Sequence, residues 1–373
     1  MKKLNISPID AIFSNGCYPI EFMLYYQNKI KTGRIRSALK NLSSNFWPMF
    51  GEFDNDIIYF EKYMEGSCFE EQVLEEEFDS TESPRSLYKK YCRINPTDPQ
   101  RLFHISILQY QNGTVIIPKL NHLAGDGYSY FYFLSLLAAV CREGSVPFKK
   151  YFIRSQFKPH HQRNILKEFR FENIGLKPIP PLEKFTLETE AISKTAIRDT
   201  IKDVASKLRQ QVSTNDILTA MILKRTVENS STRANNFQLT IPIDVRNQVK
   251  EYGSKFFGNG IMLHRMEFQT DEIRKNEIGE LAVQIRQSMP RVNGEIYLKF
   301  LAGLENLIAD QEIEQLRPFD PNSGCLVTNL SRLPATQLDF GGGKPDFIFL
   351  LTVEKNSAAI LGDTENFVIR LVY

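Results

Sequence analysis

The chain has 373 residues, of which 42% are hydrophobic and 12% aromatic, and its formal net charge at pH 7 is +2. That length allows one large hydrophobic core or two, and the composition is that of a globular protein rather than a disordered one. The near-neutral charge gives no electrostatic case for nucleic acid as the main partner.

The first ten residues, MKKLNISPID, contain two lysines but no apolar stretch after them. This pattern argues against a secretory signal. The first predicted helix is Ile35–Phe46, which Trp47-Pro48 ends. The acidic segment Phe69–Phe78 is predicted to be a solvated helix. Ser83–Pro99 is predicted to be a loop.

His122 lies between a predicted hairpin and a predicted helix. Leu102–Tyr110 and Thr114–Asn121 are predicted to form a hairpin, because an Asn-Gly pair between them is a strong turn signal. The apolar run Gly127–Val140 is predicted to be a buried helix, with Asp126 placed to cap it. His122 therefore lies where a strand ends and a helix begins, and such junctions line clefts in α/β sheets. A single histidine in this position is also common as an ordinary core residue.

The polar, basic stretch from Lys158 to Pro181 is predicted to be a crossover linker. His160 and His161 lie in it and are expected to be surface residues, because no further metal ligands are found near them. Predicted helices follow at Ile197–Gln211, Ile217–Val227, Leu281–Met289 and Leu298–Ile308, and predicted strands at Phe237–Val245, Phe347–Val353, Ala358–Leu361 and Phe367–Val372. The mixture lacks a βαβα rhythm and favours a mixed-sheet sandwich over a doubly wound fold.

Cysteine usage and the apolar runs indicate the compartment. The 5 cysteines are scattered without CxxC spacing, which is typical of reduced thiols rather than a disulfide framework or a zinc site. The longest apolar run, Tyr128–Cys141, is too short to span a bilayer. We therefore expect a cytoplasmic protein with no metal site and no membrane partner.

A glycine-rich motif follows late in the chain, at Asp339–Pro345 (DFGGGKP). A phosphate-binding loop would need Gly in place of Leu338 and Ser or Thr in place of Pro345, so the motif does not match one. Several segments together resemble the BAHD branch of the CoA-dependent acyltransferases. In family order they are Leu4–Asp10, Leu39–Gly51, His122–Gly127, Ser213–Ala220, Ile243–Arg246 with Phe257–Asn259, and Asp339–Pro345. The chain departs from the family pattern at Gly342, where Trp is usual, and at Asn329-Leu330, where Ser-Trp is usual.

The resemblance implies an α/β (α+β) fold: a two-domain CoA-dependent acyltransferase sandwich of mixed β-sheets flanked by helices, with an active-site tunnel between the domains. We expect an N-terminal domain at 1–157, a crossover linker at 158–186 and a C-terminal domain at 187–373. The implied reaction moves an acyl group from acyl-CoA to a hydroxyl or amine of a small molecule, within one ternary complex. Acyl-CoA is then a co-substrate, no cofactor stays bound, and we expect a monomer acting in secondary metabolism.

The resemblance also assigns roles to particular residues. His122 is expected to be the general base, because a neutral imidazole can accept a proton at cytosolic pH. Asp126 is expected to point away from the substrate and to pair with Arg246, which would fix the turn that Gly127 lets the backbone make. Rough alignment suggests Lys207, Ser213 and Arg332 as CoA contacts, Thr328 and Asn329 as further contacts that could donate to the oxyanion, and Asp339, Gly341 and Gly343 as structural residues of the channel wall.

Two alternatives stay open. One is a condensation-like acyltransferase that takes its acyl group from a carrier-protein phosphopantetheine. Its motif commonly begins with a doubled histidine, whereas Asn121 precedes His122 here, which favours CoA. The other is a catalytically inactive binding protein of the same fold. The acceptor, the acyl chain length and the choice between O- and N-acylation are not determined by the sequence.

Overall fold

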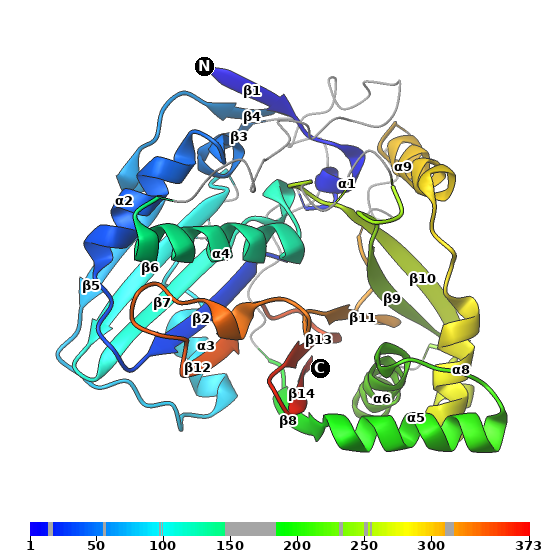
Figure 1. Ribbon diagram of the computed structural model, residues 1–373. Helices are drawn as coiled ribbons and strands as arrows, with labels where there is room; N and C mark the ends of the chain where they lie inside the picture. Colours follow the sequence, from blue (N-terminus) through cyan, green and yellow to red (C-terminus); the bar gives the residue numbers. More distant parts are fainter. Residues whose placement is uncertain are drawn as a thin grey trace.

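The computed structural model describes residues 1–13, 18–54, 57–96, 98, 100–145, 184–230, 234–249, 253, 256–309 and 317–373. Figure 1 shows two bodies, each made of sheet and helix, lying side by side. The helices of the described chain are α1 (Pro8–Ala11), α2 (Thr32–Ser43), α3 (Pro84–Tyr91), α4 (Gly127–Glu143), α5 (Lys194–Leu208), α6 (Thr214–Asn229), α7 (Thr270–Lys275), α8 (Ile278–Ser288) and α9 (Gly294–Ala309).

The strands form three sheets. The first body contains a sheet ordered β12-β2-β7-β6-β5, the second contains one ordered β10-β9-β11-β13-β14-β8, and a small sheet has the order β1-β4-β3. Their bounds are β1 (Lys2–Asn5), β2 (Ile20–Tyr26), β3 (Glu52–Asp54), β4 (Ile57–Phe60), β5 (Phe69–Val73), β6 (Phe103–Tyr110), β7 (Gly113–Leu120), β8 (Leu187–Ser193), β9 (Asn236–Asp244), β10 (Ile261–Gln269), β11 (Gly324–Asn329), β12 (Phe347–Leu350), β13 (Ser357–Gly362) and β14 (Asn366–Val372). Both larger sheets are mixed, because β5 runs parallel to β6, and β11 runs parallel to β9 and β13. The predicted mixed-sheet sandwich is therefore confirmed.

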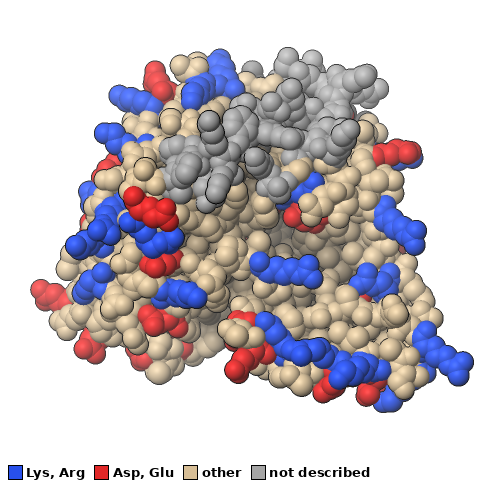
Figure 2. Space-filling model, viewed as in Figure 1, with Lys and Arg blue, Asp and Glu red and all other residues tan. Residues whose placement is uncertain are grey.

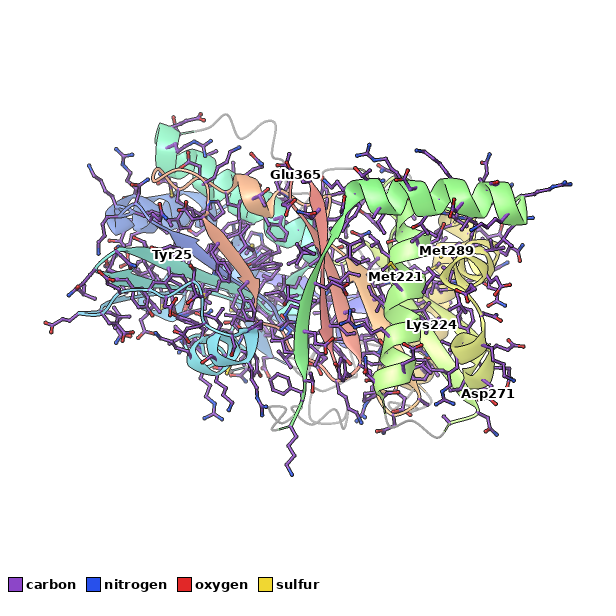
Figure 3. All side chains as sticks on the ribbon, turned by 90° about the horizontal axis from the view of Figure 1, so that it is seen from below. Tyr25, Met221, Lys224, Asp271, Met289 and Glu365 are labelled. Carbon is purple, nitrogen blue, oxygen red and sulfur yellow. The ribbon has the colours of Figure 1, made fainter. Side chains whose placement is uncertain are left out.

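Alternation along the strands buries both faces of the first sheet. In β2, Phe22 and Leu24 belong to the core shared with α2 and α4, while Met23 and Tyr25 belong to the core that α3 covers. This is the period-2 pattern of a strand between two layers. In the second body, helices α5, α6 and α8 cover one face of the sheet with their own core. Figure 3 shows the molecule from below, with Tyr25 in the first body and Met221 on α6 in the second. Strands β14 and β8 lie between them.

One strand connects the two halves of the sequence. β12 comes from the C-terminal half but pairs antiparallel with β2 at the edge of the first sheet, Leu350 lying opposite Phe22. The chain then returns, and β13 joins the second sheet. The expected C-terminal domain at 187–373 is thus not confined to one sheet.

The expectation for Phe69–Phe78 was wrong, because its first residues form strand β5 rather than a helix. Phe69 is buried, and backbone pairing with β6 over Phe69–Val73 outweighs the helix propensity of the glutamates. β5 is an edge strand, and charged side chains at an edge discourage pairing with another chain.

The expectation of a loop at Ser83–Pro99 was also wrong, since α3 occupies Pro84–Tyr91. The Ser83 hydroxyl accepts a hydrogen bond from the Ser86 backbone N–H, and Pro84 stands in the first turn. A Ser-Pro start is a recognised helix signal. Leu87 and Tyr91 anchor the helix in the core beneath the first sheet.

The predicted hairpin is confirmed by β6 and β7, and the predicted buried helix by α4. The other predicted helices and strands are also present, with ends shifted by a few residues. For example, α2 begins at Thr32 and ends at Ser43. The stretch from Lys158 to Pro181, with His160 and His161, lies outside the described residues. No helix in the described part of the chain is long and apolar enough to cross a membrane.

Candidate active site

His122 begins a short 3-10 turn, His122–Ala124, between β7 and α4. Its ring stacks on Phe13, with ring centroids 3.8 Å apart and an interplanar angle of 20°. The side chain of Asn121 accepts a hydrogen bond from the Leu123 backbone N–H at 3.0 Å, which fixes the turn locally. His122 is half-buried as a residue and lines a cavity, and its Nδ1 is buried with no hydrogen-bond partner among the described residues.

The cavity lies where the two bodies meet. Residues of the N-terminal half that line it include Phe13, Ile20, His122 and Gly127, and those of the C-terminal half include Pro242, Ile261, Thr328, Leu330, Glu354 and Arg370. Most of these side chains are apolar, so the wall suits an organic ligand with few polar groups. The cavity encloses about 790 Å³ of space, its open mouth included.

Burial changes the proton affinity of the imidazole. Burial lowers the pKa of His122 below its ordinary value, and the negative charge of Asp126 only partly opposes that effect. A lowered pKa keeps the imidazole neutral at pH 7, which is the form that can accept a proton.

The ion pair expected between Asp126 and Arg246 is present. Nη1 of Arg246 lies 2.8 Å from Oδ2 of Asp126, and Nη2 lies 2.9 Å from Oδ1. Their side chains are only 2% and 3% exposed. The carboxylate also accepts hydrogen bonds from the backbone N–H groups of Ser129 and Gly260, at 3.0 and 2.9 Å. Burial alone would raise the pKa of Asp126, but the charge and hydrogen bonds of Arg246 outweigh it and lower the pKa.

Arg246 belongs to a wider buried network behind the turn. Its Nε donates to the Phe256 carbonyl at 3.1 Å, and its Nη2 donates to the Gly258 carbonyl at 3.0 Å. Ser129, in the first turn of α4, donates to the same Gly258 carbonyl at 2.9 Å. These bonds join α4 to the segment after β9, so both halves of the chain hold the His122 turn.

Sequence reasoning assigned no role to Asp10 or Asn259, and the structure brings both to the turn. Nδ2 of Asn259 donates to the His122 carbonyl at 2.8 Å and to Oδ1 of Asp10 at 2.7 Å. Burial raises the pKa of Asp10 to about 6, although the hydrogen bonds from Asn259 and Ser7 oppose it. Both residues lie in segments that carried the family resemblance, which was the available signal.

The expected CoA contacts are not all brought to the cavity. Thr328 lines it, and Asn329 beside it is exposed, its Nδ2 donating to Oδ1 of Asn215 at 2.8 Å. Ser213 caps α6, where its hydroxyl accepts from the Asp216 backbone N–H at 3.3 Å. Lys207 has a 74% exposed side chain that pairs with Asp203.

The remaining expected contact, Arg332, is exposed. In the sequence it lies between Leu330 and Leu333, whose side chains approach Gly127 after the His122 turn. A Cβ at Gly127 would lie 3.2 Å from Cδ2 of Leu330 and 3.4 Å from Cδ1 of Leu333. Glycine at this position therefore lets the segment after β11 pack closely against the start of α4.

The DFGGGKP motif forms a tight loop at the other end of β2 from the cavity. Oδ1 of Asp339 accepts from the backbone N–H groups of Gly341 and Gly343 at 2.7 and 3.0 Å. Both glycines have positive φ, +98° and +97°. Nη1 of Arg142, near the end of α4, donates to the Asp339 carbonyl at 2.6 Å. The loop thus has an evident structural role, and none of its residues belongs to the described wall of the His122 cavity.

On the face of the molecule in Figure 2, Lys and Arg side chains are interspersed with Asp and Glu. Within the described ranges, no group of three or more His, Cys, Asp or Glu side chains is placed to hold a metal ion.

Comparison with known proteins gives a family match and several fold matches. The model of the Transferase family matches residues 73–366. No curated protein matches the chain. Among solved structures, TRI101 of F. sporotrichioides, complexed with coenzyme A and T-2, is 15% identical with a TM-score of 0.73, over 99% of this chain and 94% of that one.

Two further solved structures have the same fold. Vinorine synthase is 18% identical with a TM-score of 0.73, over 100% of this chain and 90% of that one. Polyketide synthase associated protein 5 from Mycobacterium tuberculosis is 13% identical with a TM-score of 0.62, over 99% and 92% of the two chains.

Proposed function

The chain belongs to the Transferase family, which comprises the BAHD acyltransferases, and we propose that His122 is the general base of its acyl transfer. The acyl group moves from acyl-CoA to a hydroxyl or amine of a small molecule. One observation carries this proposal: His122 lines a cavity to which both halves of the chain contribute.

The reaction needs a base, an acceptor and a thioester held together. His122 takes the proton of the acceptor as its oxygen or nitrogen attacks the thioester carbonyl. The C–S bond then breaks, and the imidazolium returns the proton to the departing CoA thiolate. General base catalysis of this kind contributes about 10²- to 10⁴-fold to the rate. No acyl-enzyme forms, so no nucleophilic side chain is required.

Asp126 and Arg246 support the reaction indirectly. Their ion pair lies behind the turn, and its charges are satisfied by each other rather than by substrate. Thr328 lines the cavity, and its hydroxyl is the candidate donor to the oxyanion. Asn329 is a weaker candidate, because its amide already donates to Asn215.

We also propose a domain division, a compartment, an oligomeric state and a form of the acyl donor. The N-terminal domain comprises 1–157, the crossover linker 158–186 and the C-terminal domain 187–373, with β12 returning to the first sheet. The enzyme acts in the cytoplasm as a monomer, on free acyl-CoA rather than on a carrier-bound thioester.

Release of CoA thiol tests the proposal. Purified protein is incubated with acetyl-CoA and longer acyl-CoAs and with a panel of alcohols and amines, and free thiol is followed. His122→Ala is expected to lower acceptor-dependent release by at least about 100-fold. His264→Ala is the matched control, because His264 is also partly buried but lies on β10 outside the described cavity wall.

Two outcomes would overturn it. If His122→Ala keeps the wild-type rate, His122 is not the base. If calorimetry detects no CoA binding and no donor releases thiol, the chain is either an inactive binding protein or dependent on a carrier-bound donor. A phosphopantetheine thioester on a carrier protein then separates those two alternatives.

A further inference from the structure

Arg370 is a buried cation in the wall of the cavity that contains His122. It lies on β14, the strand drawn in red in Figure 1, opposite Ala359 of β13. The residue is only 3% exposed. Its Nε and Nη2 atoms have no hydrogen-bond partner among the described residues. The guanidinium carbon lies 5.7 Å from the ring centroid of Phe349.

The chain does not neutralise this charge within its described part. Burial lowers the pKa of Arg370 to about 9, so the guanidinium still carries its proton at pH 7. Glu354 lines the same cavity, but burial raises its pKa to about 7, and no described carboxylate is among the groups that act on the pKa of Arg370. The titratable group that acts on Arg370 is the Tyr88 hydroxyl, which is neutral at pH 7 because burial raises its pKa to about 12.

A buried charge without a partner is costly, and buried polar groups in native proteins almost always have one. Arg370 is therefore suited to bind an anionic group of a ligand. We propose that Arg370 binds a carboxylate carried by the substrate in the His122 cavity, so that the enzyme uses an acidic acyl donor or an acidic acceptor. This inference rests on the proposed function of the cavity.

The geometry of the guanidinium favours a carboxylate. Nε and Nη2 share one edge of the group, and their parallel N–H bonds match the two oxygens of a carboxylate. Both atoms are covered in the structure, so the side chain has to turn toward the cavity as the ligand enters. Arg370 is the one Lys or Arg in the described cavity wall, where Glu354 is also present. The wall thus holds one cation and one carboxyl group whose pKa burial raises to about 7, which suits a singly charged carboxylate better than a doubly charged phosphate.

The first experiment asks whether the donor carries the carboxylate. Succinyl-CoA and butyryl-CoA have acyl chains of equal carbon number, but only succinyl-CoA ends in a carboxylate. Their dissociation constants are measured by calorimetry on the wild type, Arg370→Met and Arg370→Lys. A donor role predicts at least about 10-fold tighter binding of succinyl-CoA by the wild type, corresponding to 1.4 kcal/mol. Arg370→Met should remove that preference and Arg370→Lys should keep part of it.

The second experiment asks whether the acceptor carries it. Aliphatic and aromatic hydroxy acids are each compared with their methyl esters, as ligands in calorimetry and as acceptors in thiol release. An acceptor role predicts that the acids are preferred by the wild type and that Arg370→Met removes the preference. If neither experiment shows a preference for the acid, or if Arg370→Met keeps it, the inference is wrong.

Two controls separate the possible failures. Butyryl-CoA binding and His122-dependent thiol release in the wild type test the proposed function itself, so their loss would count against the function rather than against Arg370 alone. Melting of Arg370→Met tests its folding, and a temperature equal to or above the wild type is expected because an unpaired buried charge is removed. If that variant fails to fold, Arg370→Gln takes its place in both experiments.

Discussion

Asp126 and Arg246 place two opposite charges where almost no water reaches them. Asp126→Asn keeps the size of the side chain but leaves the guanidinium of Arg246 buried without its counter-charge. Breaking such a pair costs about 3–5 kcal/mol of unfolding free energy. We expect urea unfolding to show a loss of that size, and turnover to fall because the His122 turn is displaced.

The chain offers a matched control for this variant. Asp244 contacts the same guanidinium at 3.2 Å, but its side chain is 50% exposed. Asp244→Asn should therefore cost less than about 1 kcal/mol. If Asp126→Asn unfolds and turns over like the wild type, the pair does not fix the turn.

The lowered pKa of His122 predicts the shape of the pH profile. The imidazole has its ordinary value of 6.5 in the unfolded chain and a lower one when buried. The base form therefore persists below pH 6.5, and kcat/KM should stay level at neutral pH and fall only at lower pH. The unfolded chain binds this proton more readily than the folded one, so His122 also makes stability decrease as the pH falls through 6.5.

Phe13→Leu provides the comparison for that profile. The Phe13 ring stacks on the imidazole at 3.8 Å, and a smaller side chain should admit water and move the acid limb up toward 6.5. A wild-type limb above 6.5, or one that Phe13→Leu does not move, would contradict the role given to burial.

Asn259 connects the His122 carbonyl to the Asp10 carboxylate. Asn259→Ala leaves both acceptors buried without this donor, which costs about 1–3 kcal/mol. Because the backbone of His122 is then less restrained, kcat should fall more than the KM for acyl-CoA rises. Asn28→Ala is the control, since Asn28 also donates to a carbonyl, that of Gly342, but is exposed. Equal effects of the two substitutions on kcat would exclude a positioning role for Asn259.

At the scale of elements, the sequence predicts those helices and strands that interactions between neighbouring residues determine. The hairpin β6–β7 has two β-favouring runs, although its turn is Gln111-Asn112 and Gly113 of the expected Asn-Gly pair already lies in β7. Helix α4 has an acidic cap and a long apolar run. β5 and α3 were missed for different reasons. In β5 the backbone pairing with β6 overrides the helix propensity of Glu70 and Glu71. The start of α3 at Ser83-Pro84, by contrast, is itself a local helix signal.

The residues of the candidate site also fall into those that the sequence predicts and those that only long-range contacts bring together. His122 and Asp126 could be found from the junction between a strand and a helix, and Arg246 from family resemblance. Asn259 contacts the His122 carbonyl across 137 residues of sequence, and Asp10 across 249 residues. Arg370 looks like any other residue of an alternating strand, and only the fold shows that it is buried without a described partner. Contacts of such separation are set by sheet topology, which no local pattern encodes.

The DFGGGKP loop predicts how an element responds to a change of backbone freedom. Gly341 has φ of +98° and a Cβ there would lie 3.6 Å from Nη1 of Arg34, which is ordinary contact. Gly341→Ala should therefore destabilise through backbone strain alone, by about 1–3 kcal/mol. Because the described cavity wall excludes this loop, the acid limb of the pH profile should not move.

Gly303→Ala is the control for that variant. Gly303 lies within α9 and a Cβ there would meet nothing within 4 Å, so alanine should stabilise by about 0.5–1 kcal/mol. If Gly341→Ala shifts the acid limb, the loop acts on the site as well as on the fold.

At the scale of the whole molecule, β12 makes the two halves depend on each other. Phe349 and Leu351 pack with Met23 and Tyr25 in one core, although they come from opposite halves of the sequence. The same exchange puts Leu350 in the wall of the His122 cavity. The cavity is therefore assembled only when both halves are folded together.

This dependence predicts that the fragment 1–157 does not fold by itself. Without β12, the backbone of β2 would form an unpaired edge, and its apolar face would lose Phe349 and Leu351. An exposed edge of this kind favours aggregation over a unique fold. Near-ultraviolet circular dichroism and urea unfolding of the fragment should show no cooperative transition, whereas the full chain should unfold with the two halves coupled.

Adding a synthetic peptide of residues 345–353 to the fragment should restore part of the native signal, because the peptide supplies the missing strand. A peptide with Phe349→Asp is the control, since a charge cannot replace the ring in that core. Cooperative unfolding of the fragment without any peptide would mean that the first sheet is stable without β12.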